Sequence, residues 1–184
     1  MKDLIELQND RVKMRTLTPA DADLVMEWAH DKEVVKNFSF FQSTTTHERV
    51  EAYISEKYES TVDLLLAIFT LDGNYIGNIG IHEIDRVNDT ARLGIIIGKR
   101  AYWNRGYAQA AIRLLLSYAF TAGKLHKVYL NAFVTNTKGI RLYEKLGFQR
   151  EGLLRSEYKL RDGYQDLVHM GILAEEFQAT QKSC

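Results

Sequence analysis

The segment Trp103–Ala108, which reads WNRGYA, has the composition of a loop that binds a phosphate group. It follows a short apolar strand and precedes a long helix, and its small residues let a ligand approach the backbone closely. The first N–H groups of a helix have no partner within it, so together with the helix dipole they attract anions. Arg105, with Lys99 or Arg100, supplies full positive charge nearby. These residues alone fit either a segment that binds a phosphorylated ligand, which we expect here, or an ordinary strand-to-helix turn of an α/β protein.

Two regular elements must position this loop. The apolar residues of the following segment recur at the spacing of one buried helix face, at Ala108, Ala111, Ile112, Leu115 and Ala119. The preceding segment, residues 90–98, alternates in the manner of a strand and ends in three consecutive isoleucines. The pattern predicts a strand, a loop and a helix in immediate succession.

The rest of the chain alternates between strand and helix patterns. Before the loop we expect a strand over 12–17, a helix begun by Thr18 and Pro19, an irregular segment over 31–44, a helix begun by a capping box at Thr45–Glu48, and a hairpin with strands over 62–70 and 75–85. After the central helix we expect a strand over 126–134, a helix from Asn136 to Leu146, and a hairpin with strands over 148–160 and 164–173.

Composition excludes several classes of protein. The 184 residues suit one domain, spanning residues 1–184, and the balance of 24 basic and 24 acidic residues argues against nucleic-acid binding. No apolar run is long enough to cross a bilayer, so we expect no membrane association. The single cysteine, Cys184, favours a reducing cytoplasmic compartment. No cluster of His, Asp and Glu has metal-ligand spacing, so no metal is expected.

Three signatures resemble the GCN5-related N-acetyltransferases, the GNAT superfamily. Trp103–Ala108 resembles the family's Q/R-x-x-G-x-G/A pyrophosphate loop, with Trp in the place of Gln or Arg. Asn136–Phe148 resembles its N-x-x-A-x-x-L-Y-x-x-x-G-F segment, with Gly139 in the place of Ala. The ending Glu151–Met170 is similar to the ribosomal-protein and spermidine acetyltransferase branch. The resemblance implies an α+β, three-layer fold: a mixed, mostly antiparallel sheet of about seven strands flanked by about four helices.

The resemblance also implies acetyl-CoA as the acetyl donor and assigns roles to residues. Tyr143 would donate a proton to the departing thiolate, and Glu83 would accept the proton of the amine. Residues expected to bind the cofactor are Ile95, Ile96, Ile97, Trp103, Asn104, Arg105, Gly106, Tyr107, Ala108, Asn136, Lys138 and Arg141. Structural roles compete with these: a strand buried on both faces for the isoleucines, an N-cap for Asn136, and a solvated strand residue for Glu83.

The acceptor stays open among several classes. A primary amine on a small molecule, such as a polyamine or an amino sugar, competes with the N-terminus of a protein, and a non-catalytic acyl-CoA sensor is a further alternative. Residues 34–46 contain no acidic residue, which disfavours a polycation, although Glu33, Glu48 and Glu51 remain. Phe38, Phe40 and Phe41 either stack on a sugar or base or pin a loop to the core. The edge of the C-terminal hairpin favours a homodimer or larger homo-oligomer.

Overall fold

The computed structural model describes residues 4–36, 45–160 and 163–182. Within them the strands are β1 (Glu6–Gln8), β2 (Val12–Thr16), β3 (Leu64–Thr70), β4 (Tyr75–Asp85), β5 (Thr90–Ile97), β6 (Lys127–Phe133), β7 (Gln149–Leu160) and β8 (Gly163–Leu173). The α-helices are α1 (Ala22–Ala29), α2 (Lys32–Val35), α3 (His47–Glu59), α4 (Tyr107–Phe120), α5 (Thr137–Lys145) and α6 (Ala174–Lys182). Short 3-10 turns lie at Pro19–Asp21 and Arg100–Tyr102.

The strands form one sheet in the order β1-β2-β3-β4-β5-β6-β8-β7. β5 and β6 run parallel over three residue pairs, whereas the β1–β2, β2–β3, β3–β4, β6–β8 and β7–β8 pairs are antiparallel. The mixed, mostly antiparallel sheet confirms the fold that the sequence predicted. The eighth strand is the short β1, which the sequence pattern did not indicate.

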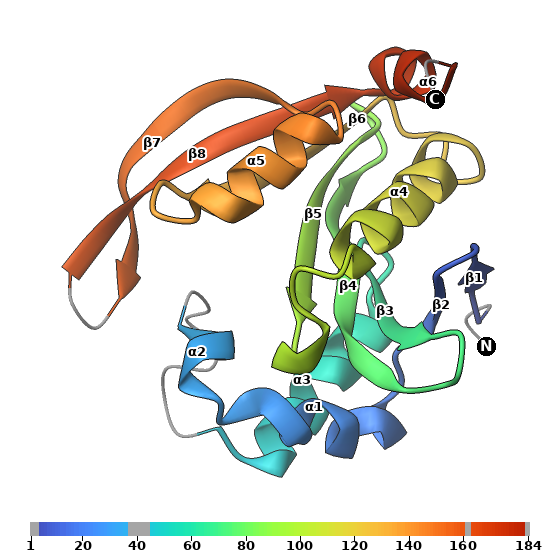
Figure 1. Cartoon of the computed structure of the whole chain (residues 1–184), viewed down its shortest axis with the longest axis vertical. Helices are drawn as coiled ribbons and strands as arrows, with labels where there is room; N and C mark the ends of the chain where they lie inside the picture. The colour runs from blue at the N-terminus through green and yellow to red at the C-terminus, as the bar shows by residue number, and fades with distance from the viewer. Residues whose placement is uncertain (1–3, 37–44, 161–162, 183–184) are drawn as a thin grey trace. The chain divides into compact units, whose positions relative to one another are not determined.

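Contacts along the chain group into two compact units, which we describe separately. Unit 1 comprises residues 1–83 and 94–115, and unit 2 comprises residues 84–93 and 116–184. In unit 1, α1 and α3 pack together, as Figure 1 shows in blue and teal. Their apolar faces bury Trp28, Val50 and Ile54 against Leu65 and Ala67 of β3. The alternate β3 residues Leu66 and Ile68 are also fully buried, so this strand is covered on both faces.

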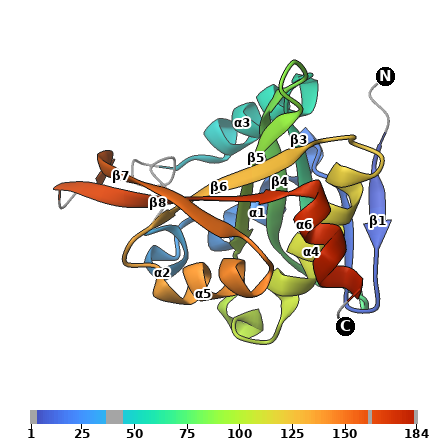
Figure 2. The ribbon, with the colours of Figure 1, turned by 90° about the horizontal axis from the view of Figure 1, so that it is seen from above.

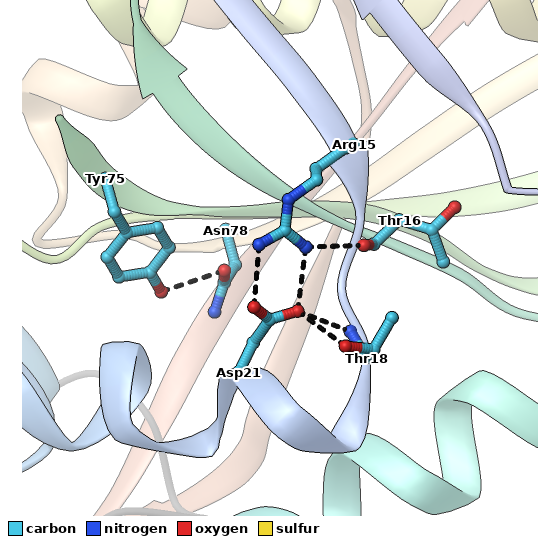
Figure 3. A network of polar contacts seen from close by, with 6 residues as sticks. All are labelled: Arg15, Thr16, Thr18, Asp21, Tyr75 and Asn78. Atoms are coloured by element: carbon cyan, nitrogen blue, oxygen red, sulfur yellow. Dashed lines mark hydrogen bonds and ion pairs between the residues drawn. The ribbon is translucent and has the colours of Figure 1, made fainter. Parts of the chain in front are cut away.

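A polar network fixes the start of α1 in unit 1 (Figure 3). The Arg15 guanidinium holds both carboxylate oxygens of Asp21, at 2.8 and 2.7 Å, and the Thr18 backbone and hydroxyl donate to the same carboxylate at 2.8 Å. A second chain of hydrogen bonds runs from the Trp28 indole to the Tyr75 hydroxyl and on to the Asn78 side chain, at 3.3 and 2.9 Å. The charged and buried polar groups in these two sets of contacts thus find their hydrogen-bond partners in one another.

Asp21 gives this network a pH dependence. Burial opposes ionisation of Asp21, but the hydrogen bonds from Arg15 and Thr18 outweigh it and hold the pKa of the carboxyl below its ordinary value. The resulting stability is fully present above the unfolded pKa of about 3.9 and is lost as the pH falls through the folded pKa. We therefore expect Asp21→Asn to unfold at lower urea concentration than the wild type at pH 7, with the gap closing near pH 3. Urea titrations followed by tryptophan fluorescence test this, and an equal gap at both pH values would contradict it.

Unit 2 is built on β6 and β8. Their inward residues alternate with outward ones, and Val128, Leu130, Met170 and Ile172 are almost completely buried. Figures 1 and 2 show α5 lying along β8, and the long β7–β8 hairpin in orange and red. Phe177 of α6 packs against Phe120, with ring centroids 5.6 Å apart, and closes this core. β7 is the last strand in the sheet order and is exposed along most of its length.

Three predictions about elements were wrong in detail. The segment predicted to be irregular contains α2, which the Asp31 side chain caps by accepting from the Glu33 N–H at 3.0 Å. The N-cap of α3 is Thr46 and not Thr45, and it accepts from the Arg49 N–H, so the third helical residue is Arg49 and not the Glu48 of the predicted box. The helix α6 was not predicted. Phe38, Phe40 and Phe41 lie outside the described residues.

Candidate active site

The predicted phosphate loop of unit 1 is an exposed turn that leads directly into α4. Asn104 and Gly106 have positive φ angles of 58° and 84°, and residues 104–106 are exposed. The Gly106 carbonyl accepts from the Ala110 N–H at 3.0 Å, which makes Gly106 the N-cap. The N–H groups of the next residues have no intrahelical partner, so the loop presents backbone donors and a helix dipole to an anion. This arrangement fits a phosphate group.

The Trp103 side chain contacts the core of unit 1 and does not act as a phosphate ligand. Its indole N–H donates to the Ile97 carbonyl at 2.7 Å, and its ring packs against the core that contains Trp28. The tryptophan therefore ties the loop to the end of β5. This contact explains why an apolar ring can stand where the family pattern has Gln or Arg, because the backbone amides of the loop are unaffected by it.

The loop is supported by two residues that the sequence did not indicate. The Arg11 guanidinium lies 5.1 Å from the centre of the Tyr107 ring and donates to the Arg105 carbonyl. The Asn9 side chain donates to the Ala110 carbonyl at 3.1 Å. The β1–β2 turn thus buttresses the first turn of α4. These contacts join positions about a hundred residues apart in the chain, and no local pattern signals them.

The basic residues before the loop are engaged elsewhere. Lys99 pairs with Glu27 of α1 at 2.7 Å, and Arg100 pairs with Asp31 at 3.7 Å. We expected Lys99 or Arg100 to add positive charge near a bound phosphate group, but in the structure both are paired with carboxylates.

The end of β5 is only partly buried. Its residues Ile95, Ile96 and Ile97 are each half-buried, whereas the structural alternative for them was a strand buried on both faces.

In unit 2, Asn136 caps α5. Its side-chain oxygen accepts from the Gly139 N–H at 3.1 Å, so the predicted structural role is present. A Cβ added at Gly139 would lie 2.4 Å from the Asn136 amide nitrogen, closer than real atoms approach. The cap therefore leaves no room for a side chain at residue 139 while Asn136 holds this rotamer. Lys138 and Arg141 are both exposed and lie three residues apart on one helix face.

Tyr143 lies on α5 with its ring edge-on to Phe148, the centroids 5.9 Å apart. The side chain is half-buried, and burial raises the pKa of its hydroxyl to about 12. The phenol is therefore fully protonated at every pH at which the protein would work. It is available as a hydrogen-bond donor and not as a base.

Glu83 ends unit 1 in β4 and is exposed. Its φ angle of 55° is left-handed, which is uncommon for a residue with a side chain and interrupts the pleat of the strand. The neighbouring His82 is buried and pairs with Asp63. The role of Glu83 as proton acceptor stays a prediction.

The comparison with protein families matches residues 11–149 to the acetyltransferase (GNAT) domain. The match covers about three quarters of the chain, including β2 to α5 and every residue of the candidate site. The chain belongs to the GNAT family. It is accordingly an acetyl-CoA-dependent N-acetyltransferase, with the mixed sheet of that fold.

Individual GNAT relatives match nearly the whole chain. The spermidine N(1)-acetyltransferase of Vibrio cholerae is 27% identical over 169 residues, 92% of this chain and 96% of that protein. YdaF of Bacillus subtilis, provisionally named a ribosomal N-acetyltransferase, is 30% identical over 177 residues, 92% of this chain and 95% of that protein. The crystal structure of the Vibrio cholerae spermidine N-acetyltransferase with CoA and spermine superimposes with a TM-score of 0.84 at 26% identity, covering 92% of this chain and 99% of that one.

Within the described residues, no group of three His, Cys, Asp or Glu side chains has the arrangement of a metal site. No helix in the described part of the chain is both long and apolar enough to cross a membrane.

Proposed function

We propose that this GNAT enzyme acetylates the primary amine of a small polycation of the polyamine type. The relatives support this, since a spermidine acetyltransferase matches over almost the full length of both chains. The observation that carries the proposal is the charge of the sequence segment that precedes β3. Residues 21–63 contain ten Asp or Glu and four Lys or Arg, a formal charge of −6 in a chain whose total is zero. Such a segment raises the local concentration of a polycation.

Some of these carboxylates are exposed and lie close together in unit 1. His47 of α3 lies 3.1 Å from the Asp23 carboxylate of α1 and 3.8 Å from the Glu51 carboxylate. The Asp23 side chain is 90% exposed, and Glu48 is also exposed. Residues 34–46 contain no acidic residue, which disfavoured a polyamine. The exposed carboxylates of α1 and α3, which lie before and after that segment in the chain, offset this lack.

The roles of the cofactor-binding residues follow from their positions in each unit. The loop from Trp103 to Ala108, with Asn104, Arg105, Gly106 and Tyr107, binds the pyrophosphate of CoA through backbone N–H groups. The backbone of Ile95–Ile97 pairs with the amides of the pantetheine arm as a sheet edge pairs with a peptide. Lys138 and Arg141 offer positive charge and Asn136 an amide on α5. Acetyl-CoA supplies the activated acetyl group that the amine attacks.

Tyr143 stabilises the departing sulfur in this proposal. A thiol titrates near 8.5, and burial raises the pKa of the Tyr143 hydroxyl to about 12. Complete transfer of the phenolic proton to the thiolate is therefore unfavourable, whereas a hydrogen bond to the developing negative charge is favourable in a site of low dielectric. We infer that Tyr143 acts as a hydrogen-bond donor and that the thiolate takes its proton from solvent.

Two alternatives compete with this proposal, and the first has specific support. YdaF favours the N-terminus of a ribosomal protein as acceptor, at 30% identity over 92% of this chain. A sensor that binds acetyl-CoA without turnover would keep the same loop but would not need Tyr143.

The homo-oligomer stays a prediction, supported by the exposed edge strand β7.

A panel of acceptors tests the proposal. We expect spermidine to release thiol from acetyl-CoA with kcat/KM at least about tenfold above glucosamine or an Ala-initiated peptide, since only the polyamine meets several carboxylates at once. The KM for spermidine should rise with salt, because exposed charges are screened. A colorimetric thiol assay measures both. Turnover with the peptide alone would favour the ribosomal alternative, and bound acetyl-CoA without thiol release would favour the sensor.

A further inference from the structure

Arg11 of unit 1 places a positive charge at the N-terminus of α4. Its guanidinium donates to the Arg105 carbonyl and lies 5.1 Å from the centre of the Tyr107 ring. The positive end of the helix dipole repels a cation at this position. Among residues 4–36, 45–160 and 163–182, no carboxylate forms an ion pair with Arg11. Helix stability therefore does not account for this charge, whereas an anion bound at the loop would.

The turn between β1 and β2 holds Arg11 in place. The side-chain oxygen of Asn9 accepts from the N–H groups of Arg11 and Val12, each at 2.9 Å, and its amide nitrogen donates to the Ala110 carbonyl at 3.1 Å. One side chain thus joins the backbone of this turn to the first turn of α4. The Arg11 guanidinium lies directly beside Gly106, because a Cβ on that glycine would lie 3.4 Å from the Arg11 Nε.

The hydrogen bond from Arg11 sets the direction of the peptide between Arg105 and Gly106. A trans peptide directs its C=O and N–H to opposite sides, so the Gly106 N–H faces away from Arg11 when the Arg105 carbonyl accepts from it. Within the described part of the chain this N–H has no hydrogen-bond partner, and Gly106 is exposed. It is therefore available to an anion, as are the unpaired N–H groups that follow it in α4.

The loop sequence alone does not fix this direction. The φ angles of Asn104 and Gly106 are left-handed, at 58° and 84°. Glycine adopts φ angles of either sign at little cost, so the peptide between Arg105 and Gly106 can rotate. A rotated peptide would direct the Arg105 carbonyl oxygen at the anion and repel it. A hydrogen bond from outside the loop is thus needed to hold the binding orientation, and Arg11 supplies it.

We propose that Arg11 is a positioning residue for the pyrophosphate of CoA. Its hydrogen bond holds the peptide between Arg105 and Gly106 so that the Gly106 N–H donates to a phosphate oxygen, a charge-assisted hydrogen bond. This inference rests on the role of the loop 103–108 in the proposed function. Because the contacts of Arg11 lie at this loop and at no reacting atom, its contribution falls on binding of the acetyl donor and not on kcat.

Titration calorimetry of CoA binding tests the proposal without any acceptor. We expect Arg11→Met, which keeps the length of the side chain but removes the donor, to raise the Kd for CoA about tenfold. Arg11→Lys keeps a charged donor and should stay within about threefold of wild type. Lys13→Met removes the same charge from an exposed residue of β2 and is the matched control, expected to bind CoA as the wild type does. Equal losses in Arg11→Met and Lys13→Met would overturn the proposal, because net charge alone would then explain both.

Shortened ligands separate the proposed role from a direct contact. Dephospho-CoA keeps the pyrophosphate but lacks the 3′-phosphate, so Arg11→Met should weaken its binding by the same factor as that of CoA. Pantetheine carries no phosphate and should bind to wild type and to Arg11→Met alike. A loss confined to CoA would overturn the proposal in favour of a contact between Arg11 and the 3′-phosphate. An equal loss with pantetheine would overturn it in favour of a general disturbance of the fold.

Amide NMR of the wild-type protein gives an answer that needs no variant. We expect inorganic pyrophosphate to shift the Gly106 amide proton downfield, since a charge-assisted hydrogen bond forms there, and to leave the amide of Gly73 unchanged, which donates to the Thr70 carbonyl in the β3–β4 turn. A Gly106 amide that does not move at saturating pyrophosphate or CoA would overturn the proposal. If CoA binds as expected but no acceptor releases thiol, the proposed function fails and the positioning role of Arg11 stands.

Discussion

Tyr143→Phe is expected to lower kcat about 1,000-fold while leaving KM for acetyl-CoA almost unchanged. The substitution removes one hydroxyl that interacts with sulfur only as negative charge develops there, so the loss falls on the transition state. The phenylalanine keeps the edge-on contact with Phe148, and folding should be unaffected. Steady-state thiol release with the best acceptor of the panel measures the effect.

The raised pKa of the Tyr143 hydroxyl also predicts how the rate depends on pH. Because burial raises the pKa of Tyr143 to about 12, the wild-type rate should show no alkaline decline from this residue up to about pH 10. Tyr164→Phe, which changes a 64% exposed tyrosine of the β7–β8 hairpin, should retain wild-type kcat. A Tyr143→Phe enzyme within about threefold of wild type would remove the role assigned to this residue.

Gly98→Ala is expected to destabilise the fold by about 3 kcal/mol, near the upper end of the usual cost of overpacking. A Cβ at residue 98 would lie 2.3 Å from the Trp28 ring, which is only 3% exposed and donates a hydrogen bond to Tyr75. The ring has no space to withdraw into, so either α1 or the start of the loop must move. Urea unfolding followed by tryptophan fluorescence gives the free energy of unfolding.

Gly152→Ala is the matched control for this prediction. A Cβ at Gly152 in β7 meets nothing within 4 Å, so its stability should stay within about 0.5 kcal/mol of wild type. Equal unfolding midpoints for Gly98→Ala and Gly152→Ala would show that Trp28 is more mobile than its packing indicates.

The local parts of the fold were predictable because local rules decide them. Thr18 and Pro19 begin the first helical turn, the spacing of Ala111, Ile112 and Leu115 gives the buried face of α4, and Asn136 caps α5 as one of its two predicted roles. Each depends on residues within one or two turns of each other. The loop between β5 and α4 was predicted in the same way, from glycine placed between a strand and a helix, and its binding of phosphate stays a prediction.

The structural features that were not predicted from the sequence depend on contacts between residues distant in the chain or on irregular backbone. Counting from the turn at Gly73 without the β-bulge in β3 pairs Asp63 with Ile81, which puts Asp63 and His82 on opposite faces. The left-handed φ angle of Glu83 is a further irregularity that no local pattern indicated, and its role as proton acceptor stays a prediction. The support that Arg11 gives to the loop has no local signal, and α2 is too short for its periodicity to be recognised.

The cap of α5 also constrains how this sequence can diverge. The Asn136 side chain occupies the space that a methyl group on residue 139 would need. Gly139→Ala therefore requires Asn136 to leave this rotamer, although the family pattern combines asparagine and alanine at these two positions. Residues 136 and 139 are thus coupled through the rotamer of the asparagine and not through its identity.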